Sequence, residues 1–318
     1  MNTAIYGPRQ VRRFFWIVAT LALLAGLVGM GATSARATYP GKNGRIAFAT
    51  DPSSGQQVIK TVRRDGTHLR RLVASAQAPD WSPDANRIVF ERDHATGPTF
   101  CSIQTIHPDG SGIVDLTGAR RGCDSDPSFT PDGRWIVFTH QCNKCHDAML
   151  RMNIKSGART RIRRVPHKVE ALDLNVSPDG KTIAFVGQKN DSRRALFTLR
   201  MKGTHLDRLT SFKLDVGTHI DWSPNGRHLV VTEYQDGPGN IATVRPDGSG
   251  YFQVTHHTGD VGAGGAVYAP SGRWVLFRRQ NDTEGNYAIW KMRPDGSQRA
   301  RVRGLKVHFG QLDWGIQR

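Results

Sequence analysis

The sequence has few acidic residues, few cysteines and only one long apolar run. Its 318 residues carry 27 Asp and Glu against 44 Lys and Arg, a formal net charge of +17. Because there is one apolar run and the mean hydropathy is -0.46, a membrane protein with several spans is excluded. The hydrophobic share of 38% and the charged share of 22% exclude disordered and fibrous proteins.

Several catalytic motifs are also missing. The sequence contains no G-x-S-x-G, no H-E-x-x-H, no Walker loop and no G-x-G-x-x-G that joins a strand to a helix. Residues 262–265 read G-A-G-G, but they lead into a strand, so we interpret them as a flexible connection rather than a phosphate loop. We therefore expect no cofactor.

The first 37 residues have the layout of a secretory signal. Arginines within residues 9–13 precede an apolar run over residues 14–32, and an A-x-A cleavage site ends at Ala37. The run of 19 residues could also serve as an uncleaved membrane anchor, which is the alternative. We expect residues 1–37 to be the signal peptide, and we expect the protein to be periplasmic, at the cell surface or secreted.

The rest of the sequence repeats itself at a nearly constant period. Six apolar segments of the same shape follow one another at intervals of 42 to 48 residues. They are residues 45–48, 87–90, 135–138, 182–185, 228–231 and 274–277. A period in the forties built from strands and tight turns is typical of propeller blades. Residues 38–318 hold six such units of about 47 residues each. We therefore predict an all-β, six-bladed β-propeller of four-stranded blades.

Each unit has a recognisable internal order. A turn such as Thr130-Pro131-Asp132-Gly133 joins a first strand to the apolar second strand, because Pro presets the turn and Gly takes its left-handed position. A second turn, often Pro-Asp-Gly, joins the third strand to a short fourth one. In the second unit Ala85 replaces the turn glycine, so we expect that turn to be strained or rearranged.

The two ends of the sequence complete one unit. Five units open with a first strand that ends in a pair such as Asp221-Trp222, whereas the first unit lacks this strand. The sequence instead ends with the same strand at residues 312–315, so we expect it to pair into the first blade and close the ring. We expect the Asp of each Asp-Trp pair to accept backbone N–H groups. The Trp side chains of the first strands, and Trp135 and Trp274 of the second, are predicted to pack in the core.

These units resemble the WD40-like (PD40) repeats of the TolB family. The closest copies are residues 221–226, which read D-W-S-P-N-G, and residues 246–250, which read P-D-G-S-G. The resemblance covers nearly everything after residue 37 and implies an exported propeller that binds a partner. The predicted propeller leaves no room for the separate N-terminal α/β domain that TolB carries.

Two classes of function follow from this prediction. The first is a non-catalytic, monomeric binding module whose partner is a protein, peptide or glycan of the cell envelope. The alternative is a secreted metal-dependent polysaccharide lyase or hydrolase, because propeller lyases that resemble this family hold a metal with histidines. The candidate ligands lie in the connections that lead into first strands, all on one face, and the simpler interpretation is that they are scattered, solvated histidines. They are His167, His219, His256, His257 and His308.

One face of the predicted propeller is the better candidate for binding. The connections into first strands and the long loops between second and third strands share this face, which we call the long-loop face. Binding residues concentrate on loops displayed by a rigid scaffold, although the same loops could simply tolerate insertions. The candidate partner-binding residues are Gln188, Asp191, Arg193, Tyr234, Asp236, Asn281 and Glu284.

An arginine cluster has two interpretations. It consists of Arg159, Arg161, Arg163 and Arg164, on a predicted outer strand. It could contact an anionic envelope surface, or it could prevent association between exposed strand edges, which is the interpretation we favour. Nucleic acid is not an expected partner for an exported protein.

The four cysteines are expected to form disulfides, as an even number in an exported chain suggests. The hairpin that turns at Pro131-Asp132 pairs positions whose numbers sum to about 264, which places Cys123 opposite Cys142 and leaves Cys101 to pair with Cys145. The alternative pairing is Cys101 with Cys123 and Cys142 with Cys145. A Cys/His metal site with His140 or His146 is a third possibility.

Overall fold

The computed structural model describes most of the chain after residue 38. The described residues are 39–50, 57–94, 99–118, 122–141, 147–165, 169–189, 193–235, 237–281, 286–302 and 309–317. All of them belong to the unit Ala35–Arg318. Their regular structure is strand, apart from the 3-10 helix η2 (Phe212–Leu214). In these ranges no helix has both the length and the apolar character needed to cross a membrane.

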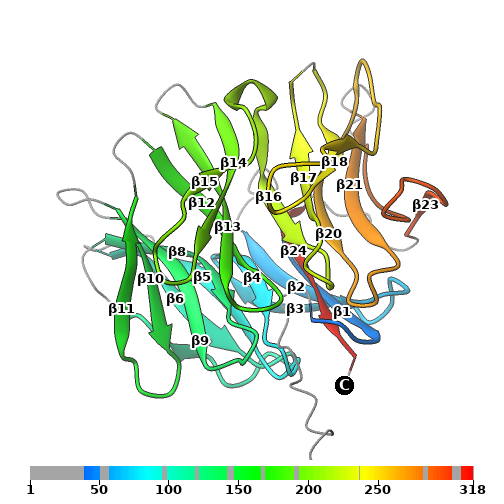
Figure 1. Ribbon diagram of the computed structural model, residues 1–318. Coiled ribbons are helices and arrows are strands. Elements are labelled where there is room, and N and C mark those ends of the chain that lie inside the picture. The colour runs from blue at the N-terminus through cyan, green and yellow to red at the C-terminus, as the bar shows by residue number, and fades with distance from the viewer. Residues whose placement is uncertain are drawn as a thin grey trace, which may run out of the picture. The chain divides into compact units, whose positions relative to one another are not determined.

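Within the described residues, the strands form four four-stranded sheets and one eight-stranded sheet (Figure 1). Three of the four-stranded sheets each use four consecutive strands. They are β12 (Val169–Val176), β13 (Thr182–Lys189), β14 (Arg194–Arg200) and β15 (Asp207–Arg208); β16 (Val216–Trp222), β17 (Leu229–Glu233), β18 (Asn240–Val244) and β19 (Phe252–Gln253); and β20 (Val261–Tyr268), β21 (Val275–Asn281), β22 (Asn286–Met292) and β23 (Ala300–Arg301). The sequence repeat therefore corresponds to a four-stranded antiparallel sheet.

The eight-stranded sheet contains two such groups of strands. They are β4 (Ala76–Trp81), β5 (Ile88–Asp93), β6 (Thr99–Ile106) and β7 (Val114–Asp115), followed by β8 (Gly122–Phe129), β9 (Trp135–Gln141), β10 (Ala148–Asn153) and β11 (Arg159–Arg164). The two groups join where β6 pairs in parallel with β8, with Cys101 opposite Cys123.

The remaining sheet combines the two ends of the described chain. Its strand order is β24 (Phe309–Ile316), β1 (Asn43–Thr50), β2 (Val58–Arg63) and β3 (Arg70–Ala74). In Figure 1 the red β24 lies beside the blue β1, and the two strands are antiparallel with Leu312 opposite Phe48. Trp314 is 5% exposed and packs in an apolar cluster with Ile46. The predicted burial of Trp314 against the first repeat is confirmed.

The turn between first and second strands explains the Ser/Thr-Pro-Asp-Gly motif. The hydroxyl of Thr130 donates to the carboxylate of Asp132 at 2.6 Å, and the N–H of Gly133 donates to the carbonyl of Thr130 at 2.8 Å. Gly133 has a φ of 65°, in the left-handed region that glycine tolerates best. Ala85 occupies the same position with a φ of 53°. The turn of the second unit therefore keeps its shape and holds an alanine in a strained conformation, rather than being rearranged.

The Asp-Trp pairs link neighbouring first strands. The carboxylate of Asp80 accepts the backbone N–H of Phe129 on β8 at 2.7 Å, and Asp221 accepts that of Tyr268 on β20 at 2.7 Å. The expected bonding of these carboxylates to backbone amides is confirmed. Each bond runs from one repeat to the next, so the motif holds successive repeats together as well as shaping its own strand.

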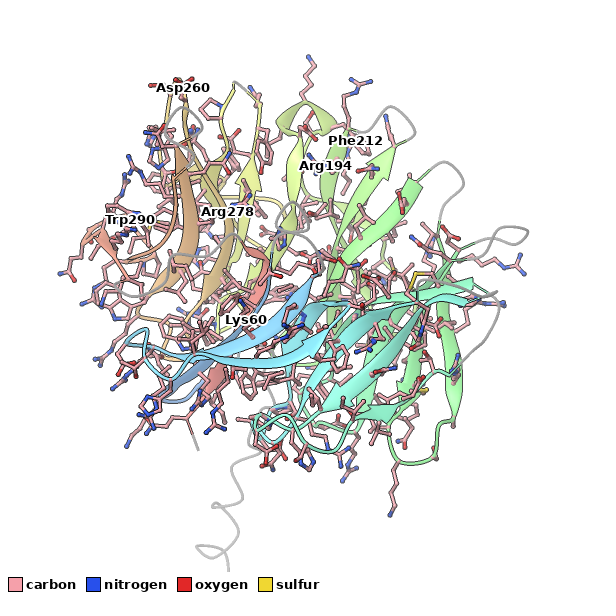
Figure 2. The ribbon with its side chains drawn as sticks, turned by 180° about the vertical axis from the view of Figure 1, so that it is seen from behind. Lys60, Arg194, Phe212, Asp260, Arg278 and Trp290 are labelled. Carbon is pink, nitrogen blue, oxygen red and sulfur yellow. A yellow bond between two sulfur atoms is a disulfide. The ribbon has the colours of Figure 1, made fainter. Side chains whose placement is uncertain are left out.

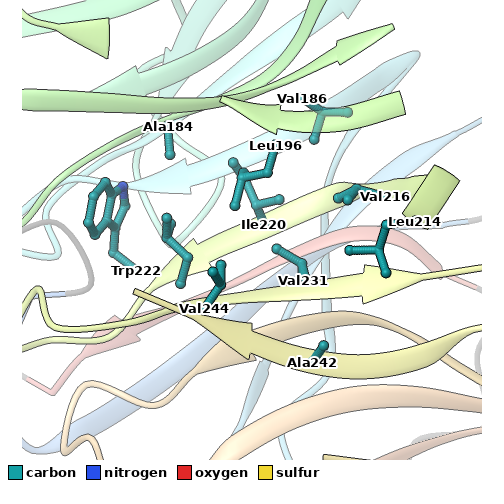
Figure 3. Close-up of a cluster of buried hydrophobic side chains, with 11 residues drawn as sticks. Ala184, Val186, Leu196, Leu214, Val216, Ile220, Trp222, Val231, Ala242 and Val244 are labelled. Atoms are coloured by element: carbon teal, nitrogen blue, oxygen red, sulfur yellow. The ribbon is translucent and has the colours of Figure 1, made fainter. Parts of the chain in front are cut away.

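The hydrophobic core lies between adjacent sheets. Figure 3 shows one cluster, to which β13 and β14 contribute Ala184, Val186 and Leu196 and the next sheet contributes Ile220, Trp222 and their neighbours. Trp222 is 2% exposed, and its indole N–H donates to the carbonyl of Asn175 at 3.1 Å. Burial of a residue of this size stabilises the fold by roughly 2 to 3 kcal/mol.

Two tryptophans of the second strands lie at the margin of the core, and Trp274 packs against the cluster that contains Ile46 and Trp314. Trp135 and Trp274 are only half-buried. The guanidinium of Arg151 lies 5.0 Å from the centroid of the Trp135 ring, and that of Arg293 lies 4.4 Å from the Trp274 ring. Long basic side chains cover the exposed part of these rings.

Candidate functional site

A β-bulge interrupts the first strands at a recurring position, two residues before the Asp of the Asp-Trp pair or its equivalent. The residues at this position, from β4 through β8, β12, β16 and β20 to β24, are Ala78, Asp126, Asp173, His219, Gly265 and Gln311. All of them except Gly265 line a narrow cavity of about 50 Å³ between the first strands. The repeat therefore brings side chains from distant parts of the sequence to one central place.

The same position contributes to a wider pocket of about 370 Å³. Glu91, Asp126, Glu170 and Asp173 give this pocket four carboxyl groups, and no Lys or Arg is among the described residues that line it. We call it the acidic pocket. It opens on the long-loop face, because Gln141, at the end of a second strand, also lines it.

Glutamine side chains bind the carboxyl groups of the acidic pocket. The amide of Gln77 donates to Glu91 at 2.9 Å, and the amide of Gln141 donates to Glu170 at 2.8 Å. The carboxylate of Asp173 accepts the backbone N–H of Ile220 at 2.6 Å. These partners are neutral, so they satisfy hydrogen bonds without neutralising negative charge.

The electrostatic consequence is a set of raised pKa values. Burial raises the pKa of Glu91 to about 8, and the nearby carboxylate of Asp126 adds to the shift. Burial raises the pKa of Asp126 to about 6, and burial followed by the charge of Asp126 raises the pKa of Asp173 well above its usual range. A positively charged ligand would therefore stabilise the ionised forms of the carboxyl groups in this pocket.

His219 is the one candidate histidine that the structure places in this pocket. It lies within β16 rather than in a loop, and its Nε2 is buried without a hydrogen-bond partner among the described residues. Burial lowers the pKa of His219 to about 4, with smaller contributions from the guanidinium groups of Arg278 and Arg194, which Figure 2 labels on β21 and β14. His219 is therefore neutral at physiological pH, and it offers the pocket a nitrogen that can donate or accept.

The other candidate histidines do not join His219 within the described part of the chain. His256 and His257 lie between β19 and β20, and neither lines the acidic pocket. His167 and His308 lie outside the described residues. The one described group of three possible metal ligands is Glu91 with Cys101 and Cys123, and these two cysteines are joined in a disulfide.

The candidate partner-binding residues lie at strand ends of the long-loop face. Gln188 is opposite Arg194 across β13 and β14, and Asn281 ends β21. Tyr234 is half-buried, because its ring lies against the backbone of Gly217 and Gly239. None of these three lines the acidic pocket, nor does Arg193, which is exposed just before β14. Asp191, Asp236 and Glu284 lie outside the described residues.

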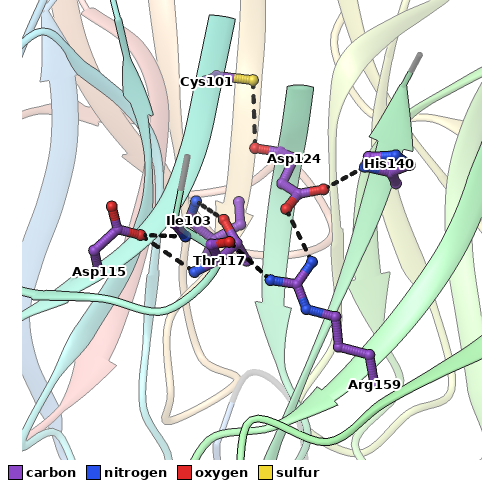
Figure 4. Close-up of polar contacts among 8 residues, drawn as sticks. Cys101, Ile103, Asp115, Thr117, Asp124, His140 and Arg159 are labelled. Atoms are coloured by element: carbon purple, nitrogen blue, oxygen red, sulfur yellow. Dashed lines mark hydrogen bonds and ion pairs between the residues drawn. The ribbon is translucent and has the colours of Figure 1, made fainter. Parts of the chain in front are cut away.

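The arginine cluster divides into two bonded and two exposed side chains. Arg159 donates to the carbonyl of Thr117 at 2.9 Å and lies 3.5 Å from the buried carboxylate of Asp124, which also contacts His140 (Figure 4). Arg163 donates to the carbonyl of Gly203 in the next sheet at 2.8 Å. Only Arg161 and Arg164 are exposed. Arg159 and Arg163 therefore tie β11 to its neighbours.

The structure corrects the preferred disulfide pairing. Cys101 is joined to Cys123, with their Cα atoms 4.6 Å apart, so the pairing of Cys123 with Cys142 is wrong. The hairpin register was close, since Gln141 lies opposite Cys123. The parallel bridge between β6 and β8 nevertheless brings Cys101 nearer. Cys142 and Cys145 lie outside the described residues.

Sheets that pack face to face, linked first strands and a central cavity define the chain as a β-propeller. It belongs to the PD40 family, described as the TolB beta propeller domain, which matches residues 44–263. TolB from Acinetobacter baumannii has a TM-score of 0.70 at 18% identity, over 94% of this chain and 71% of that one. An oligogalacturonate lyase in complex with manganese has a TM-score of 0.56 at 13% identity, over 82% of this chain and 74% of that one.

One relative is similar in sequence over about half of this chain. An uncharacterized protein of Agrobacterium fabrum is 25% identical over 183 residues, which cover 55% of this chain and 57% of the relative. The chain thus spans less than two thirds of the length of this relative. The solved structures are similar in fold alone, because their sequences are so distant.

Proposed function

We propose that the chain is an exported, non-catalytic and monomeric β-propeller that binds a protein, peptide or glycan partner through its long-loop face. Its propeller has six blades, counting β4–β7 and β8–β11 separately, and β24 closes the ring on β1. Residues 1–37 act as the export signal and residues 38–318 form the propeller. The pairing of β24 with β1 and the signal-like N-terminus support this arrangement.

The observation that carries the proposal is the acidic pocket. Four carboxyl groups line one pocket, and no Lys or Arg is among the described residues that line it with them. The protein as a whole has a net charge of +17, so a pocket of the opposite sign is a local feature. A lysine or arginine of a partner peptide that enters the pocket would replace the missing positive charge and would be held by desolvated carboxylates.

The experiment measures binding of a basic peptide. Pentalysine is titrated calorimetrically into the purified full chain and into a double variant, Asp126→Asn with Glu170→Gln. Asn tolerates the left-handed backbone of residue 126, whose φ is 50°, and Gln keeps an acceptor for Gln141. We expect the double variant to bind at least tenfold more weakly, since it removes two charges from a shielded pocket.

The matched control is Asp179→Asn, in a turn on the opposite face. Asn225 already forms the same turn in the next sheet, so this variant removes a carboxylate without changing the fold. It should bind pentalysine like the parent chain. Cross-linking in the native envelope with the same variants then identifies the partner. Equal binding and equal cross-linking by the pocket variant would exclude the acidic pocket as the binding site.

The alternative is the metal-dependent lyase or hydrolase. His219 favours it, because a neutral imidazole with an unpartnered Nε2 among carboxylates is a possible metal ligand. Elemental analysis of the purified protein distinguishes the two functions. One tightly bound metal per chain, lost in His219→Ala together with polysaccharide cleavage, would establish the enzyme and displace the binding module.

A further inference from the structure

The tight turns of the face opposite the acidic pocket pack against one another in series. A Cβ placed on Gly133 would lie 3.5 Å from Pro83, and one placed on Gly180 would lie 3.4 Å from Pro131. The glycines at residues 226 and 272 face Pro178 and Pro224 in the same way. Each of these turn prolines therefore covers the fourth position of the turn in the next repeat.

This series is interrupted in front of Ala85. The sheet that precedes its turn is β24–β1–β2–β3, in which the first and second strands come from opposite ends of the chain. No turn joins β24 to β1, so among the described residues the series of turn prolines has no member from this sheet in front of Ala85. A cavity of about 440 Å³ lies here, lined by Ala85, Pro108 and Ile316 on its apolar side. Its volume is in the range of small-molecule sites.

Three arginines give the cavity its charge. Arg45, Arg63 and Arg64 line it, with Asp65 as the one acidic residue. The carboxylate of Asp65 accepts the N–H and hydroxyl of Thr67 at 2.9 Å and 2.7 Å. Among the described residues, no ion pair connects the three arginines to a carboxylate. Burial, followed by the nearby charges of Arg70 and Arg63, lowers the pKa of Arg45.

A buried indole completes the lining. Trp81 is 3% exposed, borders the cavity, and has an indole N–H without a partner among the described residues. Trp222 and Trp314, its counterparts in other first strands, donate their indole N–H groups to backbone carbonyls at 3.1 Å and 3.2 Å. Trp81 therefore differs from its counterparts in having no such acceptor among the described residues.

We infer that this cavity is a binding site for a small organic anion, with a carboxylate or phosphate at the arginines and an apolar body against Ile316 and Pro108. The interrupted series of turns leaves the space, the arginines supply the charge, and Trp81 forms part of the wall. The site lies on the opposite face from the acidic pocket, so the partner of that pocket and this anion do not compete for contacts.

The test compares an intact probe with its fragments. Phenyl phosphate and benzoate are titrated calorimetrically into the purified full chain at low ionic strength, beside inorganic phosphate and phenol. Phenyl phosphate, benzoate or both should bind at least tenfold more tightly than either fragment, and the comparison of the two shows which oxyanion is preferred. The indole N–H resonance of Trp81, assigned with Trp81→Phe, should shift during the titration.

Variants locate the binding. Arg63→Gln with Arg64→Gln should weaken binding at least tenfold, and both side chains are exposed enough that the fold should not change. The control is Arg134→Gln, an exposed arginine beside the turn of another sheet, which should bind like the parent chain. Equal affinity of the double variant, fragments that bind as tightly as the intact probes, or an unshifted Trp81 resonance would each overturn the site.

Discussion

At the scale of single residues, Glu91 has the most distinctive environment in the acidic pocket. Its pKa is raised from 4.5 to about 8 by burial and by Asp126, so the folded protein binds a proton that the unfolded chain releases. Stability from this proton is fully present below the unfolded pKa and is lost as the pH rises through the folded value. We expect the free energy of unfolding to fall from about pH 5 to pH 9.

The variant Glu91→Gln tests this dependence, because Gln mimics the protonated carboxyl and keeps an acceptor for Gln77. It should flatten the decline, gaining on the order of 1 to 3 kcal/mol over the parent chain between about pH 5 and pH 9. Urea unfolding at several pH values provides the measurement, and Asp179→Asn is the control. A parallel pH profile for Glu91→Gln and the parent chain would show that this carboxyl group is ionised normally.

At the scale of strands and turns, local sequence was sufficient to predict the hairpins. The Ser/Thr-Pro-Asp-Gly motif determines both the turn and the register, because its hydroxyl, carboxylate and glycine N–H bond within four residues. The acidic pocket was not predicted, because its side chains meet only where β-bulges interrupt the first strands. A bulge turns the side chain of Asp126 or Asp173 toward the central cavity. The alternation of side chains along a regular strand does not predict that direction.

A signal for the pocket was nevertheless present in the sequence. When the first strands are aligned on the Asp-Trp pair, the position two residues earlier is Asp126, Asp173, His219 or Gln311 in four of the repeats. Polar residues that recur at one position of a buried strand indicate that these side chains share a polar environment. Glu91 gave no such signal, since it lies on a second strand whose equivalents differ.

The disulfide belongs to the same scale, because it depends on how two strands meet. Trypsin cleaves after Arg92, Arg121, Arg134 and Lys144, which puts the four cysteines on four different peptides. Non-reducing mapping should find the peptide of Cys101 joined to that of Cys123. Replacing both by alanine should cost about 3 kcal/mol of stability in urea unfolding, as expected for a loop of this length. A link between the peptides of Cys123 and Cys142 would contradict the structure.

At the scale of the whole molecule, the period of the repeat predicted the propeller and the unpaired ends predicted which strands would meet. Residues that contact one another only through this closure are far apart in the sequence. The carboxylate of Asp313 accepts the backbone N–H of Trp81 at 2.7 Å, and the indole of Trp314 donates to the carbonyl of Gly44 at 3.2 Å. Periodicity predicts such contacts, whereas local propensity cannot, because they depend on the number of repeats.

The last prediction concerns deletion of residues 312–318, which removes most of β24. Leu312 and Trp314 would no longer pack against Ile46 and Phe48, and β1 would have an unpaired edge. Losing two large buried side chains costs roughly 3 to 6 kcal/mol, which is comparable to the total stability of many domains. Urea unfolding should show a strongly lowered midpoint, and size-exclusion chromatography should show association through the free edge.

Two further samples make this prediction specific. Deletion of Arg318 alone, beyond the end of β24, should unfold like the full chain. A synthetic peptide of residues 309–318, added in excess to the truncated chain, should restore the midpoint, because it supplies the missing strand by pairing with β1. A truncated chain that unfolds at the same urea concentration as the full chain, with no response to the peptide, would mean that β24 does not hold the ends of the propeller together.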